Sequence, residues 1–348
     1  MPPSTATRTE PRSAVLARRA VSIPAVVGLT AVGLLASPVL VVVAIAWDLT
    51  HGRPRLPLLR TTLFVMQYLV IECIEIAVAG PMWIAAGFGT QLHRRWAQRP
   101  HRALQAWSVG VLERRASRLL GVRFDLPAGF ESALRPGPAI VVSRHVSLLD
   151  AVVPTMLYAR LGYHSCGVVM ATLRFDPGFD LIYRRTGSVF IVRNNDPRAP
   201  VIAAQVTRML DGSTAAIIFP EGRLARPELI PAVLDRLRAR DPLRADRLAG
   251  LRHMLPPRPA GLDALLDAAP GVDVVVIGHA GFERIASITQ LARRAPLRDP
   301  IVLRAERIAR SDVPTDDTAR TEWLDALWLD LDAWIDRQGG SGPAGSAS

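Results

Sequence analysis

The most marked absence in this sequence of 348 residues is lysine, because all 42 basic side chains are arginine. A Walker A loop needs a lysine that reaches the nucleotide phosphates, and a Schiff base forms on a lysine amine, so both kinds of site are excluded. Only two cysteines occur, Cys73 and Cys166. Two are too few for a disulfide framework or a cysteine-based zinc site, and they favour a reducing compartment.

Other absences narrow the function further. Aromatic residues make up only 6% of the chain, and no nucleic-acid-binding motif is present, which argues against a nucleic-acid partner. The motifs His-Glu-x-x-His, Gly-x-Ser-x-Gly and Gly-x-Gly-x-x-Gly are missing, and no histidine spacing suits a metal, so no metal or other cofactor is predicted. What is abundant is arginine, with a net charge of +11. Guanidinium groups bind phosphate in bidentate fashion, so anionic lipid and phosphorylated substrates stay open.

Two long apolar segments lie in the first hundred residues. Residues 21–47 carry no charged side chain. As a helix, this segment would be about 40 Å long, whereas the hydrocarbon core of a bilayer is about 30 Å thick. A signal peptide has an apolar region of only about 7–15 residues, so a membrane span is the better interpretation. A second apolar segment covers residues 61–90. We predict a basic N-terminus over 1–20 and a transmembrane helical hairpin over 21–92.

The second apolar segment contains two acidic residues, Glu72 and Glu75, which are three apart and share one helix face. Each carboxylate costs about 2.5–3.5 kcal/mol in the middle of a membrane. Either this helix spans and turns the acidic face toward the first helix, or it lies partly in the membrane interface. The first interpretation is favoured.

Arginines flank the hairpin on both sides, and the positive-inside bias therefore orients both flanks toward the cytoplasm. This predicts an integral protein of the cytoplasmic membrane, with the rest of the chain on the cytoplasmic side. Residues 93–120 form an amphipathic helix whose arginines suit lipid headgroups, so a membrane-proximal position is predicted. An ordinary helix that packs against the following domain is an equal alternative.

The pattern changes from about residue 121, where short apolar runs alternate with helical segments. We expect helices near 150–161, 199–211, 227–240 and 260–269. Seven strands are expected, over 122–126, 139–142, 166–170, 188–192, 214–219, 272–277 and 301–305. Such alternation predicts an α/β domain, over 121–337, with a mostly parallel sheet flanked by helices. Apolar residues at helical spacing over 323–335 predict a helix that packs on the core, and the Gly/Ser-rich tail, 338–348, is predicted to be disordered.

The end of the second strand holds the most informative segment. His145 and Asp150 follow a buried strand, five positions apart, so they would not meet on one regular helix. Ser147-x-x-Asp150 resembles a capping box, which would direct the Asp150 side chain back to the turn that carries His145. A histidine oriented by an aspartate is the usual general base near neutral pH. A purely structural His–Asp pair at a helix start is the alternative.

Two further segments also place polar groups after a strand. The first runs from Gly187 to Arg193, and the second is Phe219-Pro-Glu221-Gly222-Arg223. An arginine that leaves a buried strand is well placed to bind an anion, although a surface salt bridge is the more common arrangement for such a residue. Function gathers at the carboxyl ends of strands in parallel sheets, so the three segments together favour one site.

In this order, His-x4-Asp, Gly-x3-Ile-x-Arg and Phe-Pro-Glu-Gly resemble the motifs of the glycerolipid acyltransferase family, and most closely those of 1-acylglycerol-3-phosphate (lysophosphatidic acid) acyltransferases. The resemblance covers residues 120–305. An apolar hairpin before this region is typical of many members. The resemblance implies a glycerolipid acyltransferase-like α/β fold and a role in phospholipid synthesis.

The resemblance also implies a reaction. A fatty acyl group would pass from acyl-CoA or acyl carrier protein to the free hydroxyl of 1-acylglycerol-3-phosphate and give phosphatidic acid. His145 would remove the hydroxyl proton, and Asp150 would orient His145 and stabilise its charge. The substrate-binding residues would be Arg193, Glu221, Gly222, Arg223 and Gly187. The implied partners are the lysophospholipid acceptor, the acyl thioester donor and membrane lipid.

The chain departs from the family pattern at three positions. Arg144 stands where members usually have Asn, Arg223 stands where they have Thr, and the segment 274–279 lacks the usual Pro. Since both arginines lie near the presumed phosphate site, another lysophospholipid or a glycolipid is the alternative acceptor. A membrane scaffold that binds anionic lipid without catalysis is the alternative from another class.

Overall fold

The computed structural model describes residues 10–135, 137–191 and 199–340. Within these residues, seven strands form one sheet in the order β1-β7-β6-β2-β5-β3-β4. All neighbours are parallel except β6 and β7, which confirms the expected α/β class with a mostly parallel sheet. The strands are β1 (Phe124–Asp125), β2 (Ala139–Ser143), β3 (His164–Met170), β4 (Val189–Ile191), β5 (Thr214–Ile218), β6 (Asp273–Ala280) and β7 (Ile301–Ile308).

The central strand β2 lies between β6 and β5. Its sequence, Ala-Ile-Val-Val-Ser, is buried at every position, as is that of β5, because helices cover both faces of the sheet. In the register of the sheet, Val142 of β2 lies beside Ile218 of β5 and Val276 of β6. The carboxyl ends of these three strands therefore meet at one edge, and the residues that follow them are brought together.

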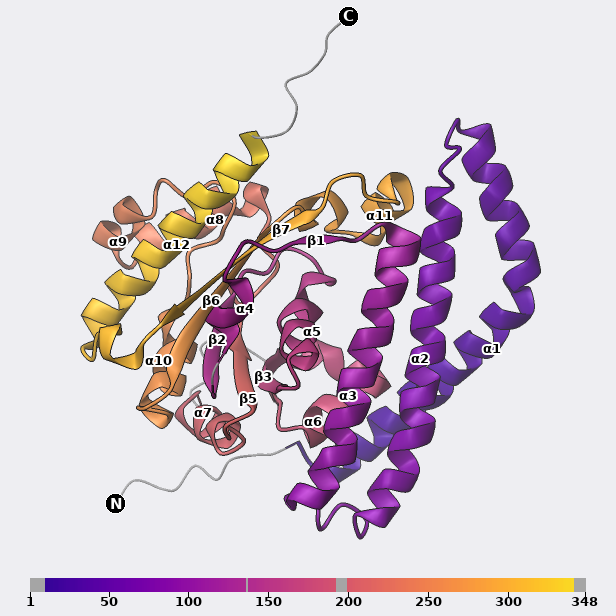
Figure 1. Cartoon of the computed structure of the whole chain (residues 1–348), viewed down its shortest axis with the longest axis horizontal. Helices are drawn as coiled ribbons and strands as arrows, with labels where there is room; N and C mark the ends of the chain where they lie inside the picture. The colour runs from indigo at the N-terminus through magenta and orange to yellow at the C-terminus, as the bar shows by residue number, and fades with distance from the viewer. Residues whose placement is uncertain (1–9, 136, 192–198, 341–348) are drawn as a thin grey trace, which may run out of the picture.

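Helices cover the sheet on both sides (Figure 1). Helices α7, α10 and α12 lie on one side, while α5 packs on the other with α3 and α2 outside it. The helices of this domain are α4 (Phe130–Leu134), α5 (Val153–Arg160), α6 (Pro177–Arg185), α7 (Ala199–Thr207), α8 (Ile230–Arg238), α9 (Pro242–Arg247), α10 (Pro259–Ala268), α11 (Ile288–Arg294) and α12 (Asp317–Gly340).

Helices α5, α7, α8, α10 and α12 confirm the helices expected from the sequence, whereas α4, α6, α9 and α11 were not expected. The start of α6 nevertheless carries local signals. Asp176 is its N-cap and accepts a hydrogen bond from the Phe179 N–H at 2.8 Å, and Pro177 occupies the first turn. Helix α12 packs on the core as expected, with Leu324, Trp328 and Leu331 buried. The disordered tail was predicted to begin at residue 338, which is wrong because α12 continues to Gly340. The last eight residues of that tail lie outside the described residues.

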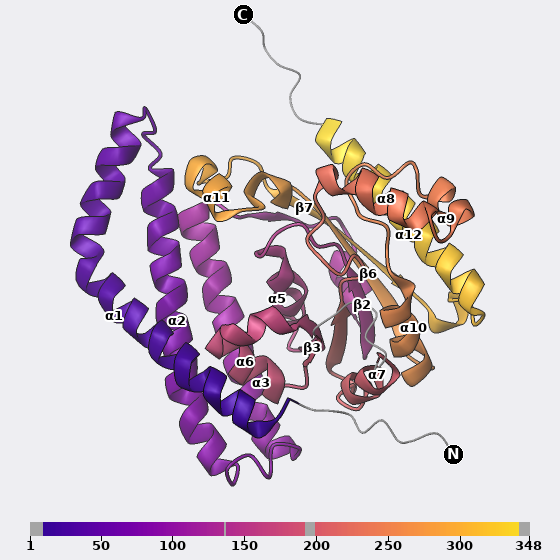
Figure 2. The ribbon, with the colours of Figure 1, turned by 180° about the vertical axis from the view of Figure 1, so that it is seen from behind.

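Before this domain, α1 (Arg12–Thr50) and α2 (Pro57–Ala85) pack against each other as a hairpin. Both are long and apolar enough to cross a membrane. Helix α1 contains Pro24 and Pro38 and is visibly bent (Figure 2). Large apolar side chains of α1 are exposed along its length, including Leu35, whose exposed fraction is 84%. The α/β domain does not cover this surface.

The acidic face of α2 turns toward α6 and not toward α1, so the predicted orientation of Glu72 and Glu75 is wrong. Glu72 instead accepts a hydrogen bond from the Gly178 N–H of α6 at 2.9 Å. Both carboxylates surround Gly178, where a Cβ atom would collide with them. The physical reason is that the start of α6 offers unpaired N–H groups and a partial positive charge, which attract carboxylates.

Both helices of the hairpin contact α6, and the Arg185 guanidinium donates to the Ala79 carbonyl oxygen of α2 at 2.6 Å. At the start of α1, Arg19 pairs with Asp180 at 2.7 Å. After α2, helix α3 (Arg95–Arg115) begins, and the Gln98 amide donates to the Arg185 carbonyl oxygen at 2.8 Å. Helix α3 corresponds to the expected amphipathic helix, and its apolar side packs against α2 and α5. Its Trp96 and Trp107 are exposed, so the helix combines domain packing with an exposed aromatic surface.

Candidate active site

The candidate site lies where β2, β5 and β6 end. His145 and Asp150 follow β2, the turn 219–222 follows β5, and His279 lies near the end of β6. This is the position that sequence reasoning expected, since the carboxyl ends of parallel strands gather functional groups. The sheet order puts the β2 loop in the middle, with the other two segments on either side.

His145 and Asp150 are in direct contact. The Nδ1 atom of His145 lies 2.6 Å from Oδ1 of Asp150. Burial alone would raise the pKa of Asp150, but the bonds from His145 and His279 outweigh it and hold this pKa well below its usual range. The carboxylate is therefore an acceptor only, so Nδ1 of His145 must carry the proton. Nε2 keeps its lone pair, as a general base requires.

The backbone fixes the orientation of Asp150. Its Oδ2 atom accepts from the N–H groups of Val146 and Ser147, at 2.6 and 2.8 Å. Half of the expected capping box is therefore present, namely the bond from the Ser147 N–H to Asp150. The other half differs, because the Ser147 hydroxyl accepts from the Leu149 N–H. A short 3-10 helix begins at Asp150. Helix α5 then starts three residues later, which leaves Pro154 in its first turn, where it disturbs no helical hydrogen bond.

Glu221 supports the same loop from the neighbouring strand. Its Oε2 atom accepts from the His145 N–H at 2.9 Å, and its Oε1 atom accepts from the Leu255 N–H at 3.3 Å. Burial raises the pKa of this carboxyl to about 8, although the Arg144 charge and the two backbone bonds oppose the shift. Gly222 has a φ of 67°, a left-handed conformation that favours glycine and closes the turn.

The structure gives Glu221 a different place from the one that the sequence suggested. It is buried and does not line the cavity described below, so it positions His145 and does not contact a substrate there. Gly187 does not line the cavity either. It turns the chain before β4 with a φ of 101°, and a Cβ atom would collide with Met209.

Arg144 is also placed differently from the expectation that it lies near a phosphate site. It is 1% exposed, and its guanidinium forms an ion pair with Glu283 and donates to the carbonyl oxygens of His279 and His253, at 2.8 and 3.1 Å. Glu283 therefore neutralises the charge of Arg144 inside the protein. Arg144 does not add to the positive charge that a substrate would meet.

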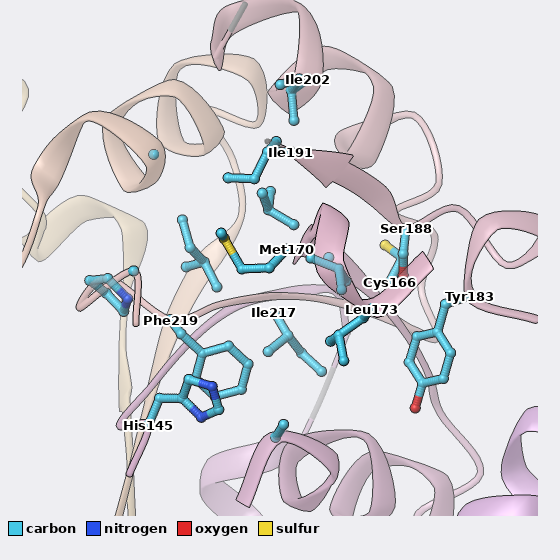
Figure 3. A pocket seen from close by; sticks show the side chains of 18 of the residues that line it. His145, Cys166, Met170, Leu173, Tyr183, Ser188, Ile191, Ile202, Ile217 and Phe219 are labelled. Carbon is cyan, nitrogen blue, oxygen red and sulfur yellow. The ribbon is translucent and has the colours of Figure 1, made fainter. Parts of the chain in front are cut away.

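A cavity of about 400 Å³ opens beside His145 (Figure 3). His145 and Phe219 lie at one end, and their rings are 4.6 Å apart between centroids. Tyr183, Cys166 and Ser188 lie at the opposite end, with Met170, Leu173 and Ile217 between. The walls are mainly aliphatic and aromatic, and the volume is in the range of small-molecule sites. An imidazole base at the end of an apolar cavity suits a substrate with a hydrocarbon chain and a reactive polar end.

Comparison with known proteins shows which kinds of enzyme this site resembles. Residues 128–278, which contain His145, Asp150 and Glu221, match a protein-family model described as Acyltransferase. This part of the chain is therefore similar to acyltransferase domains. The 1-acyl-sn-glycerophosphate (LPA) acyltransferase PlsC from Thermotoga maritima is a solved structure that resembles the chain, with a TM-score of 0.47 and 15% identity over 81% of this chain and 100% of that one. No curated protein matches the sequence.

Two arginines of the α/β domain line the cavity together with His145, namely Arg223 and Arg258. Among residues 10–135, 137–191 and 199–340, no carboxylate forms an ion pair with either one. Burial lowers the pKa of Arg258, and the charges of Arg223 and Arg240 lower it further. Neighbouring guanidinium groups that lack an acidic partner favour an anionic ligand. The predicted Arg193 lies outside the described residues.

Sequence reasoning missed two residues of this site, Arg258 and His279. Arg258 precedes α10 and is tied to the turn after β5, because its N–H donates to the Pro220 carbonyl oxygen at 2.9 Å. His279 is 1% exposed, and its Nε2 atom lies 3.3 Å from Oδ2 of Asp150. Neither residue lies in a recognisable motif. The only local signal for His279 is an imidazole directly after the apolar run of β6.

Proposed function

We propose that this protein transfers a fatty acyl group from an acyl thioester, acyl-CoA or acyl carrier protein, to the free hydroxyl of 1-acylglycerol-3-phosphate. The product is phosphatidic acid. The observation that carries the proposal is the His145–Asp150 pair at the end of an apolar cavity that also contains two arginines, for which the described residues provide no acidic partner. The acyltransferase domain supplies the reaction class, and these neighbours supply the substrate class.

The mechanism follows from the proton positions. Nε2 of His145 removes the proton from the acceptor hydroxyl as its oxygen attacks the thioester carbonyl carbon. The imidazolium that forms is stabilised by the Asp150 carboxylate, 2.6 Å from Nδ1. When the tetrahedral intermediate collapses, the carbon–sulfur bond breaks and the imidazolium returns the proton to the departing thiolate. His145 is thereby restored, and the products are an ester and a free thiol.

The cavity is the proposed acyl-chain site. Its walls between His145 and Tyr183 are apolar, so a chain that leaves water there gains about 0.8 kcal/mol for each buried methylene. Because His145 lies at one end, a chain bound in this cavity would hold its thioester carbonyl beside the base. This arrangement orients the two reacting groups before the chemical step.

Arg223 and Arg258 are the proposed phosphate-binding groups. Each guanidinium can donate two parallel hydrogen bonds to phosphate oxygens, and both groups line the same cavity as His145. The presence of Arg223 where related motifs have Thr favours a second candidate, the same reaction on another phosphate-bearing lysophospholipid or on a charged glycolipid. Both candidates share an anionic headgroup and a free hydroxyl.

Membrane attachment through α1 and α2 completes the proposal. Both helices are long and apolar enough to span a bilayer, and the apolar surface of α1 is exposed. Both helices are attached to α6, because Arg19 of α1 pairs with Asp180 and Glu72 of α2 accepts from the Gly178 N–H. We place the α/β domain and both flanks of the hairpin on the cytoplasmic side, as the arginine bias predicts. The lysophospholipid acceptor would then reach the site from the adjacent lipid.

The test uses the full-length protein in detergent or lipid vesicles, with palmitoyl-CoA and lysophosphatidic acid. Thiol release and phosphatidic acid are measured for the wild type, His145→Ala and a matched control, His253→Ala. His253 contacts Asp336 on α12 and is absent from the cavity. We expect only His145→Ala to lose activity. Equal thiol release by the wild type and His145→Ala would overturn the assignment of the base, and a panel of lysophospholipids and glycolipids would separate the two acceptor candidates.

A further inference from the structure

Asp150 contacts a second imidazole besides that of His145. His279, at the end of β6, lies on the other side of the carboxylate, with its Nε2 atom 3.3 Å from Oδ2. We propose that His279 is a positioning residue that shares the charge of Asp150 and so sets how firmly Asp150 holds the His145 ring. This inference rests on the proposed role of His145 as the base, but one of its tests below does not depend on catalysis.

The proton of His279 is fixed by its surroundings. Nε2 lies 3.2 Å from the Arg144 carbonyl oxygen and 3.3 Å from the Asp150 carboxylate, and both of these groups only accept hydrogen bonds. Nε2 must therefore carry a hydrogen atom and point it between the two acceptors. Within the described residues, the buried Nδ1 atom has no hydrogen-bond partner. The ring is thus held entirely through Nε2 and through its edge contact with Phe282, at 5.0 Å between centroids.

Two departures from the family pattern are in contact here, namely Arg144 and the segment 274–279, which lacks the usual Pro and ends in His279. Arg144 replaces the usual Asn, and its guanidinium donates to the His279 carbonyl oxygen at 2.8 Å while its own carbonyl oxygen accepts from the His279 ring. Glu283 closes the arrangement by its ion pair with Arg144 and by accepting from the Gly281 N–H at 2.7 Å. The second imidazole and the buried arginine therefore form one reciprocal unit that connects β6 to the loop of His145.

The consequence for His145 follows from electrostatics. A donor on Oδ2 withdraws part of the negative charge that Oδ1 offers to the His145 ring. Without that donor, Asp150 would stabilise the His145 imidazolium more strongly, and the free base would form only at higher pH. The other charged groups that face this pair are Arg144, Glu221 and Glu283 inside the protein, and Arg223 and Arg258 on the cavity side. Substitution at position 279 leaves all of them in place.

His279 does not line the cavity, so it acts through Asp150 and not on a substrate. Two variants distinguish the effect of the Nε2–H donor of His279 from the effect of its ring shape. His279→Phe keeps a flat ring but removes the donor. His279→Gln ends in an amide nitrogen that can donate from the position of Nε2. His279→Asn, whose shorter amide stops short of Asp150, is a second donor-free variant in case the phenylalanine variant does not fold.

The first measurement is a titration of His145 without substrate. The side chain of His145 is 17% exposed on the open cavity, so diethyl pyrocarbonate can reach it, and mass spectrometry of peptides gives its modification rate at each pH. We expect the midpoint of this rate to rise by about half a unit to one unit in His279→Phe and His279→Asn. In His279→Gln it should stay at the wild-type value. An unchanged midpoint in both donor-free variants would overturn the inference.

The second measurement is the pH profile of kcat/KM with palmitoyl-CoA and lysophosphatidic acid. The acid limb should move upward in the donor-free variants, so that activity below the limb falls about three- to tenfold while the plateau changes much less. A lower plateau with an unmoved limb would instead indicate a merely structural role and would contradict the inference. If the wild type shows no transfer at all, the proposed function fails, whereas the titration still decides the role of His279.

Discussion

Replacing Asp150 by asparagine tests the geometry of the site most directly. The backbone N–H groups of Val146 and Ser147 both point at Oδ2, at 2.6 and 2.8 Å. These two donors fix the orientation of the amide, because its carbonyl oxygen must face them. The NH2 group then occupies the position of Oδ1 and points at Nδ1 of His145. That ring nitrogen must become an acceptor, so the proton moves to Nε2 and the base is lost.

The magnitude follows from this change of tautomer. Loss of the general base costs about 10²–10⁴-fold in rate, and we expect Asp150→Asn near the upper end, about 10³–10⁴-fold in kcat. That corresponds to about 4–5 kcal/mol of transition-state stabilisation. Stability should fall by only about 1.5–3 kcal/mol, the worth of hydrogen bonds to a charged group. The loss of activity must therefore exceed what partial unfolding explains.

The assay is thiol release from palmitoyl-CoA with saturating lysophosphatidic acid, together with thermal unfolding of the same samples. On the His145→Ala background, Asp150→Asn should cause little further loss, because the two residues act as one unit. A folded Asp150→Asn protein that keeps a third of the wild-type kcat would refute the reasoning. Additive losses in the double variant would equally contradict the assignment.

Three further predictions concern the surroundings of this pair. Arg258→Gln should raise KM for lysophosphatidic acid about tenfold to a hundredfold with little change in kcat, because about 1.5–3 kcal/mol of charged hydrogen bonding is lost. The control is Arg252→Gln, at an exposed arginine that pairs with Asp336, and it should leave KM unchanged. Met170→Trp fills the middle of the cavity and removes space for about two methylenes, so at about 0.8 kcal/mol each the preference for long over short acyl-CoA should fall about tenfold in competition assays. Because burial raises the pKa of Glu221 to about 8, the folded state binds this proton more tightly than the unfolded state does. The stabilisation of the folded state by this proton is complete below the unfolded pKa of about 4.3 and is lost as pH rises through 8. Thermal unfolding from pH 5 to 9 should show this decline in the wild type, and a less steep decline in Glu221→Gln.

Local patterns predicted much of the architecture. Each of the seven expected strands is present, because a run of apolar residues bounded by turn residues needs no information from distant parts of the chain. Helix α6 was missed, although Asp176 and Pro177 mark its start, because nine residues are too few to distinguish a helical period from a short buried run. The orientation of Glu72 was predicted wrongly for a different reason. Its partner, the Gly178 N–H, belongs to a helix more than a hundred residues away.

The contact between His145 and Asp150 could be predicted because both lie in one turn, where five residues of chain suffice to bring Nδ1 and Oδ1 to 2.6 Å. Its surroundings could not. Arg144 seemed to add charge for a substrate, yet its partner Glu283 comes from beyond β6 and neutralises it inside the protein. No spacing in the sequence reveals that an arginine will be buried against a carboxylate 139 residues away.

The amino-acid sequence by itself determined the kinds of element, the two long apolar helices and the local geometry of one histidine and one aspartate. The tertiary structure decided which strands are neighbours, and that order alone brings Glu221 under the backbone of His145, His279 onto Asp150 and Arg258 into the cavity. The physical reason is that hydrophobic periodicity acts over a few residues, whereas strand order reflects how all the apolar faces of the chain are buried at once.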